Sequence, residues 1–152
     1  MWIDEWNDIA AEHKLTTKSN GTVYYKPILE QYGKLIEKHP NPASVTFCWM
    51  QGERDAREKL SAAYYDALKQ LITNLRRDLK APKMNFVIGR LSDFGKPDYT
   101  DWQNVRKAQV KPAEEDELGL TLQDAVRRQA RGHDVVVPGR ARPRPVDAVL
   151  PP

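Results

Sequence analysis

The sequence predicts an α/β domain with a parallel sheet, and three observations support this. Residues 44–50 form an apolar, β-branched and aromatic run of strand length. A second apolar run covers residues 84–89, and a long helical pattern lies between the two. Buried strands of parallel sheets are near-continuous apolar runs of this kind. A strand, a helix and a second strand form a βαβ unit, whose crossover is expected to be right-handed.

Length and composition indicate one soluble domain. The chain has 152 residues, of which 40% are hydrophobic and 30% charged, and this length can bury most of its apolar surface. No run of about 18 apolar residues could span a membrane. The first residues are acidic and lack the apolar core of a signal peptide, so we expect no secretion signal. Cys48 is the single cysteine of the sequence, so an internal disulfide is excluded. Its place in the first predicted strand indicates that it is buried and acts as a small apolar residue.

Two segments precede the first strand. Residues 1–23 are polar, but a few apolar side chains at helical spacing suggest a short amphipathic helix or an insertion that packs on the domain. Residues 24–39 are predicted to form a helix of about four turns. Its apolar positions recur at intervals of three and four: Tyr25, Ile28, Leu29, Tyr32, Leu35 and Ile36.

A polar turn, Gln51-Gly52-Glu53, ends the first strand. Open α/β sheets bind ligands in the crevice beyond the carboxyl ends of their strands. A glycine at this position allows another group to approach the backbone closely, and polar side chains flank it. The turn is therefore a candidate polar site.

The remaining helices have sequence signals at their starts. Asp55 is predicted to cap a helix that continues to residue 79, with Glu58 completing a capping box. Asp101 is predicted to cap a helix over residues 102–111.

The C-terminal part of the chain differs in composition. The net charge is +3, from 24 basic and 21 acidic residues. Residues 119–152 contain six of these basic residues, all arginine, and three of the acidic ones, so residues 1–118 are neutral overall. Residues 119–152 are predicted to form an Arg/Pro-rich tail, either out-of-frame sequence or a native disordered segment. The tail has no aromatic residues for base stacking, so no nucleic-acid partner is expected.

The turn belongs to a longer pattern that resembles a known family. Trp-x-Gln-Gly-Glu-x-Asp, over residues 49–55, is similar to the third conserved block of the carbohydrate-esterase branch of the SGNH hydrolases. This branch includes sialate O-acetylesterases and acetylxylan esterases. Three downstream features agree in order: Tyr64-Tyr65 in a helix, the strand at residues 84–89, and Val105-Arg106-x-x-Gln109. The resemblance implies a three-layer α/β/α, flavodoxin-like domain over residues 24–118, incomplete, with residues 1–23 as a helical or irregular segment.

The resemblance also implies a reaction. Family members hydrolyse O-acetyl esters on sugars such as sialate or xylan, without a metal or organic cofactor, and they are often secreted or periplasmic. The expected partner is an acetylated carbohydrate, with no membrane association. The family's nucleophile lies in an early Gly-x-Ser block and its base in a late Asp-x-x-His block, and this sequence contains neither. Ser92 comes nearest to a nucleophile, but it is not in a glycine-bounded elbow.

By the same resemblance, four residues are the candidate site. Gln51 and the Gly52 backbone N–H would donate hydrogen bonds to the oxyanion, Glu53 would orient or polarise the site, and Arg106 would anchor it from a neighbouring helix. The alternative is a structural role, in which Gln51 and Glu53 bind loop backbone and Arg106 pairs with Glu53 or caps a strand end. The alternative function is a non-catalytic, carbohydrate- or protein-binding remnant of the α/β domain.

Overall fold

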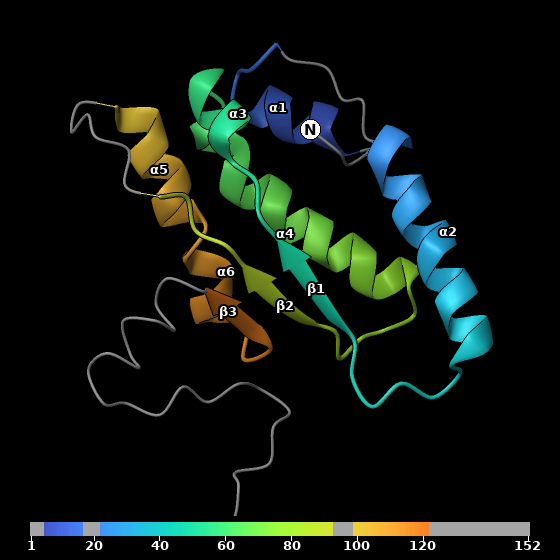
Figure 1. Cartoon of the computed structure of the whole chain (residues 1–152). Coiled ribbons are helices and arrows are strands. Elements are labelled where there is room, and N and C mark those ends of the chain that lie inside the picture. Colours follow the sequence, from blue (N-terminus) through green and yellow to red (C-terminus); the bar gives the residue numbers. More distant parts are fainter. Residues whose placement is uncertain (1–4, 17–21, 93–98, 122–152) are drawn as a thin grey trace, which may run out of the picture.

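The computed structural model describes residues 5–16, 22–92 and 99–121 of the chain. Within these residues, a pair of helices precedes each strand (Figure 1). In order, the elements are α1 (Trp6–Glu12), α2 (Thr22–Lys38), β1 (Thr46–Trp49), α3 (Glu53–Arg57), α4 (Ser61–Asp78), β2 (Asn85–Ile88), α5 (Thr100–Ala108), α6 (Lys111–Glu115) and β3 (Gly119–Thr121).

The described strands form one parallel sheet in the order β1-β2-β3. Thr46 lies opposite Asn85 at one end of the first pair. Phe86 lies opposite Gly119 in the second pair. The predicted α/β class with a parallel sheet, incomplete relative to the full three-layer domain, is confirmed.

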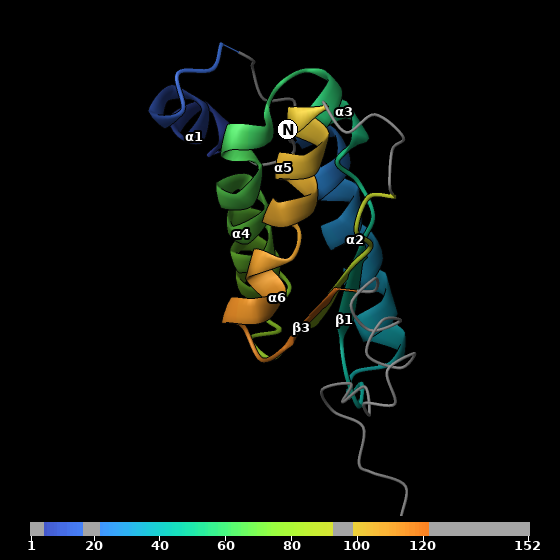
Figure 2. The same cartoon turned by 90° about the vertical axis from the view of Figure 1, so that its left-hand side faces the viewer.

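Helices cover one face of this sheet. Figure 2 shows α4, α5 and α6 on the same side of the strands. The side chains of Trp49, Phe86 and Ile88 are buried, at 8%, 1% and 0% exposure. Cys48 is exposed, so the prediction of a buried cysteine is wrong. Neighbouring residues of a strand point to opposite faces, and Cys48 belongs to the face that the described helices leave open.

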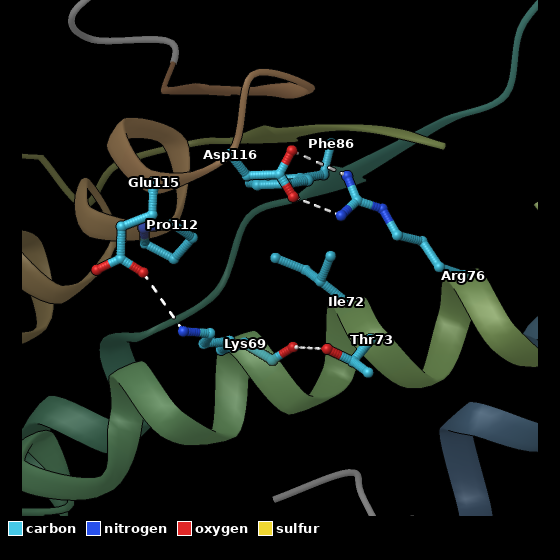
Figure 3. A pocket seen from close by; sticks show the side chains of 8 residues that line it. All are labelled: Lys69, Ile72, Thr73, Arg76, Phe86, Pro112, Glu115 and Asp116. Carbon is cyan, nitrogen blue, oxygen red and sulfur yellow. Dashed lines mark hydrogen bonds and ion pairs between the residues drawn. The ribbon is translucent and has the colours of Figure 1, made fainter. Parts of the chain in front are cut away.

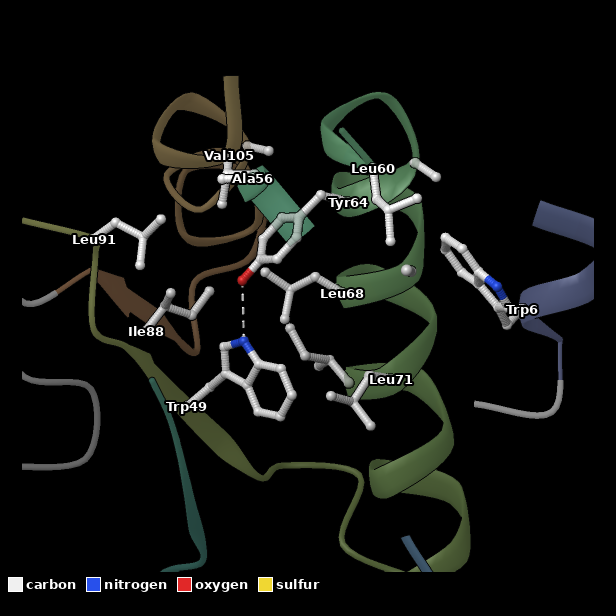
Figure 4. Packing of buried hydrophobic residues seen from close by; sticks show 14 of the residues in the cluster. Trp6, Trp49, Ala56, Leu60, Tyr64, Leu68, Leu71, Ile88, Leu91 and Val105 are labelled. Carbon is white, nitrogen blue, oxygen red and sulfur yellow. Dashed lines mark hydrogen bonds between the residues drawn. The ribbon is translucent and has the colours of Figure 1, made fainter. Parts of the chain in front are cut away.

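Helix α4 supplies much of the core. Its apolar side chains recur every three or four residues, which places them on one face of the helix toward the sheet. Figure 4 shows the upper part of this packing, with the Trp49 indole and the Tyr64 ring between the strands and α4. The buried apolar residues are Trp6, Ala10, Trp49, Ala56, Leu60, Ala63, Tyr64, Ala67, Leu68, Leu71, Ile72, Leu75, Met84, Phe86, Ile88, Leu91, Trp102, Val105 and Ala108.

The two N-terminal helices attach to α4 by different contacts. The amphipathic character expected within residues 1–23 is confirmed in α1, where Trp6 is fully buried, and His13 Nε2 lies 2.7 Å from Asp66 Oδ2. In α2, Tyr25 donates its hydroxyl hydrogen bond to Asp78 Oδ2 at 2.8 Å. The predicted helix over residues 24–39 agrees closely with α2.

The prediction of a single helix from Asp55 to residue 79 is wrong, because α3 and α4 are separate helices. Lys59 adopts a left-handed φ of 59°. Its N–H donates to the Ala56 carbonyl, and the Leu60 N–H donates to the Asp55 carbonyl at 2.8 Å. This pair of hydrogen bonds is the Schellman arrangement that ends a helix. Asp55 is therefore inside α3, which has no side-chain cap.

The expected cap of the later helix is also wrong. α5 begins at Thr100 and has no side-chain cap, and Asp101 lies in its first turn. The Asp101 carboxylate instead accepts a hydrogen bond from Ser61 Oγ at 2.6 Å, which joins α5 to the start of α4. The sheet also continues beyond the expected domain boundary at residue 118, since Gly119–Thr121 form β3. The rest of the expected tail, residues 122–152, lies outside the described residues.

An ion pair joins α4 to the loop before β3. Arg76 binds the Asp116 carboxylate, and it also donates to the Met84 carbonyl at 2.9 Å and 3.1 Å. The hydrogen bond from Arg76 lowers the pKa of Asp116. Because this pKa is lower in the folded than in the unfolded chain, the pair stabilises the fold above the unfolded pKa of about 3.9 and this stabilisation is lost as pH falls through the folded value.

We therefore expect Asp116→Asn to lower the free energy of unfolding by about 1–3 kcal/mol at pH 7, and by clearly less at pH 3. Urea unfolding at both pH values measures the difference. Glu114→Gln, at an exposed position of the neighbouring α6, is the control and is expected to be near neutral at both. An Asp116→Asn deficit that is equal at pH 7 and pH 3 would contradict the assigned role of the ion pair.

Candidate active site

The Gln51-Gly52-Glu53 turn lies where β1 ends and α3 begins, at the carboxyl end of the strand. Gly52 is buried and has a φ of 154°, a value that residues with a side chain rarely adopt. A Cβ atom at this position would lie 2.8 Å from Val105 Cγ1 and 3.1 Å from Gln109 Nε2. The glycine therefore lets the turn pack directly against α5.

The main-chain carbonyl of Gln51 accepts two hydrogen bonds. Tyr64 donates its hydroxyl to this oxygen at 2.6 Å, and Gln109 Nε2 donates to it at 2.9 Å. The Tyr64 oxygen in turn accepts from Trp49 Nε1 and from Gln109 Nε2, both at 3.2 Å; the first of these is drawn in Figure 4. Gln109 Oε1 accepts from the Leu91 N–H at 2.9 Å. The Gln51 carbonyl and its two donors therefore link strand β1, helix α4, the C-cap of α5 and the segment after β2.

The Gln51 side chain lies against Asp55. Its Nε2 donates to Asp55 Oδ2, and its Oε1 is buried with no donor among the residues that the structure describes. Asp55 is 3% exposed. Burial raises the pKa of its carboxyl, and the hydrogen bond from Gln51 partly offsets this effect. The side-chain amide is thus held by a buried acid one turn further along the chain.

The other two candidate residues differ in burial. Glu53 is exposed at the first position of α3. Arg106 is 4% exposed on α5, directly after Val105, the residue closest to a Cβ atom at Gly52. The structure therefore brings Gln51 and Gly52 against the helix that carries Arg106, while Glu53 lies at the surface of the same turn.

The comparisons with known proteins bear on this arrangement. A family model described as carbohydrate esterase, sialic acid-specific acetylesterase, matches residues 3–128. The chain belongs to this family. No significant match was found among curated proteins or among solved structures. The matched region of this esterase family begins before residue 24 and ends after residue 118, so it includes both α1 and β3.

Two further residues contact the candidate site, and the sequence indicates them only as parts of a pattern. The order and spacing of Tyr64 and Gln109 agree with the family pattern, but they indicate no role for either residue. Gln109 is fully buried, and its position one helical turn after Val105 was the signal that both side chains face the same neighbour. Asp55 is predicted from the sequence to cap a helix, but its carboxylate instead accepts a hydrogen bond from the Gln51 side chain.

The described serines do not form a catalytic pair with a histidine. Ser92 is exposed after β2, and its carbonyl accepts a hydrogen bond from Trp102 Nε1 at 2.9 Å. Ser61 binds Asp101, and His13 pairs with Asp66. Residues 93–98, which follow Ser92, lie outside the described part of the chain. Within that part, no cluster of acidic, histidine or cysteine side chains could hold a metal ion, and no helix has the length and apolarity to cross a membrane.

A separate pocket lies over the amino-terminal half of β2 (Figure 3). Side chains of α4, β2, α6 and the residue after it line the pocket, which has a volume of about 150 Å³. Its two cations are both paired, Lys69 with Glu115 and Arg76 with Asp116. The lining residues are Lys69, Ile72, Thr73, Arg76, Phe86, Pro112, Glu115 and Asp116. This pocket is distinct from the turn after β1, which lies beyond the opposite end of the strands.

Proposed function

We propose that this chain contributes to the hydrolysis of O-acetyl esters on sugars such as sialate or xylan, and supplies the oxyanion side of the site. The observation that carries the proposal is the Gln51-Gly52 turn, which is held at the carboxyl end of β1 by hydrogen bonds from the buried side chains of Tyr64 and Gln109. This is the edge of a parallel sheet where ligands bind. The family match to sialic acid-specific acetylesterases supports an acetyl ester as substrate.

Each candidate residue has a role in this proposal. The Gly52 N–H and the second N–H of the Gln51 amide donate toward the oxygen of the acetyl group as it becomes negatively charged. Such donors are effective because they are fixed before the reaction begins. Glu53 orients the substrate at the mouth of the site, and Arg106 supports the turn from α5. The sequence has neither the Gly-x-Ser block nor the Asp-x-x-His block of the family, and no serine is hydrogen-bonded to a histidine among the described residues, so we expect the chain to be inactive alone.

Hydrolysis of p-nitrophenyl acetate tests this expectation. The purified chain should release p-nitrophenol no faster than a heat-denatured control, and Ser92→Ala should leave the rate unchanged. If the chain were much faster than the control, and one serine substitution abolished this activity, a nucleophile would be present. That result would contradict the assignment of the chain to the oxyanion side alone.

Binding without turnover is the second candidate function, and the serine contacts favour it. Ser61 donates its hydroxyl hydrogen bond to Asp101, and His13 pairs with Asp66 rather than with a serine. The test is calorimetric titration with an O-acetylated sugar and with the same sugar after deacetylation. Gln51→Ala should weaken binding of the acetylated form about tenfold. Glu58→Ala, at an exposed position at the far end of α3, is the control. Equal affinity for both sugars would contradict recognition of the acetyl group.

A further inference from the structure

The two hydrogen bonds to the Gln51 carbonyl oxygen also determine the direction of the Gly52 N–H, which belongs to the same peptide unit. A peptide unit is planar, and in a trans peptide the C=O and the following N–H point in opposite directions. The described residues contain no cis peptide bond. The Gln51 oxygen faces Tyr64 and Gln109, so the Gly52 N–H must point away from both side chains. No acceptor for this N–H is found among the residues that the structure describes.

The direction of both donors is determined by their other contacts. Gln109 Oε1 accepts from the Leu91 N–H, which can only donate. The Nε2 end of the amide must therefore face Gln51. The Tyr64 oxygen accepts from the Trp49 indole N–H, which is also only a donor, so its own hydrogen is available for Gln51. Burial raises the pKa of Tyr64, which keeps this hydroxyl protonated.

We propose that Tyr64 and Gln109 are positioning residues, which hold the Gln51–Gly52 peptide so that the Gly52 N–H faces the acyl oxygen of the substrate. Neither side chain contacts the substrate. They act by fixing the orientation of the Gln51–Gly52 peptide unit. The close packing of Gly52 against Val105, which leaves no room for a Cβ atom, restricts the same peptide unit. The inference rests on the proposed function and adds the residues that orient its backbone donor.

The test uses the full chain labelled with ¹⁵N and ¹³C, with sodium acetate as the probe. Acetate is the product of deacetylation, and its oxygens are acceptors for the same donors. The Gly52 amide resonance should shift and saturate as acetate is added. Tyr64→Phe removes one donor to the Gln51 oxygen, and Gln109→Glu removes the other while keeping an acceptor for Leu91. Each should weaken the acetate response of Gly52 about tenfold.

Two matched control variants distinguish a specific effect on the Gly52 N–H from a general effect of the same type of substitution. Tyr65→Phe makes the same change at a half-buried tyrosine on α4, whose hydroxyl binds Glu115, and Gln103→Glu adds the same charge on α5. Both should respond to acetate as the parent chain does. A response in the two site variants equal to that of the parent would overturn the inference and leave the proposed function standing. No response of Gly52 in the parent would overturn the direction assigned to its N–H, and the sugar titration would decide separately on the function.

A second measurement, made on the parent chain, tests the inference even if the variants fail to fold. In the parent chain, Gln109 Nε2 donates to the Gln51 carbonyl oxygen at 2.9 Å, so the scalar coupling between this nitrogen and the Gln51 carbonyl carbon should be detectable. If that coupling is absent from a spectrum in which backbone hydrogen-bond couplings of α4 are seen, the two residues do not hold the peptide and the inference fails.

Discussion

Gly52→Ala is expected to lower the free energy of unfolding by at least about 2 kcal/mol. Two costs combine at this position. The φ of 154° is strained for any residue with a Cβ, and the added atom would lie 2.8 Å from Val105 Cγ1. The Val105 side chain is fully buried and cannot move aside without disturbing its own neighbours. Urea unfolding followed by circular dichroism measures the loss.

Gly33→Ala is the matched control for this prediction. Gly33 lies inside α2, and a Cβ there would meet nothing within 4 Å. Alanine in an open helical position stabilises by about 0.5–1 kcal/mol, because it restricts the unfolded chain. The two substitutions should therefore have opposite signs. A Gly52→Ala chain as stable as the parent would show that the turn does not pack against α5 as described.

Leu75→Ala is expected to have an effect of similar or larger size, about 2–5 kcal/mol. Leu75 is fully buried on α4, and truncation would leave a cavity between this helix and its neighbours. Leu35→Ala, at a position that is 58% exposed on α2, is the control and is expected to change stability by less than about 1 kcal/mol. Denaturant midpoints with unchanged slopes provide the comparison. Similar losses at both positions would mean that α2 is packed far more closely than its exposure indicates.

Sequence patterns were sufficient for the elements that depend on apolar spacing. The runs around β1 and β2 and the stripe of α4 bury apolar side chains, and that requirement is visible in the order of the residues. The same patterns could not place the end of α3. A left-handed position at a helix end is usually glycine, and here Lys59 occupies it, so the sequence contains no stop signal between α3 and α4.

Whether a strand residue is buried depends on which helices cover its face of the sheet. A short apolar stretch of sequence does not specify those helices. Cys48 lies within an apolar run, yet it is exposed because the described helices cover only the opposite face. The same limit applies to hydrogen-bond partners. Asp101 has the type and place of a helix cap, but a serine 40 positions earlier in the chain is within reach of its carboxylate.

The sequence pattern predicts the location of the candidate site, but it does not predict the contacts within the site. The Gln51-Gly52-Glu53 turn was predicted at the end of a strand, and it is there. That the Gln51 side chain would lie against Asp55, or that its carbonyl would bind Tyr64 and Gln109, depends on the packing of α4 and α5. These contacts join residues that are 13 and 58 positions apart from Gln51.

The strands occur in the sheet in the same order as along the chain. Each strand therefore adds to the edge formed by the one before it, and no described strand has to insert between two earlier ones. Proteins are synthesised from the N-terminus, so β1, α4 and β2 can associate as soon as Ile88 has left the ribosome. The Gln109 contact to Gln51 forms only when α5 follows. During synthesis, the Gln51 carbonyl therefore lacks one of its two donors until the chain has been made as far as Gln109.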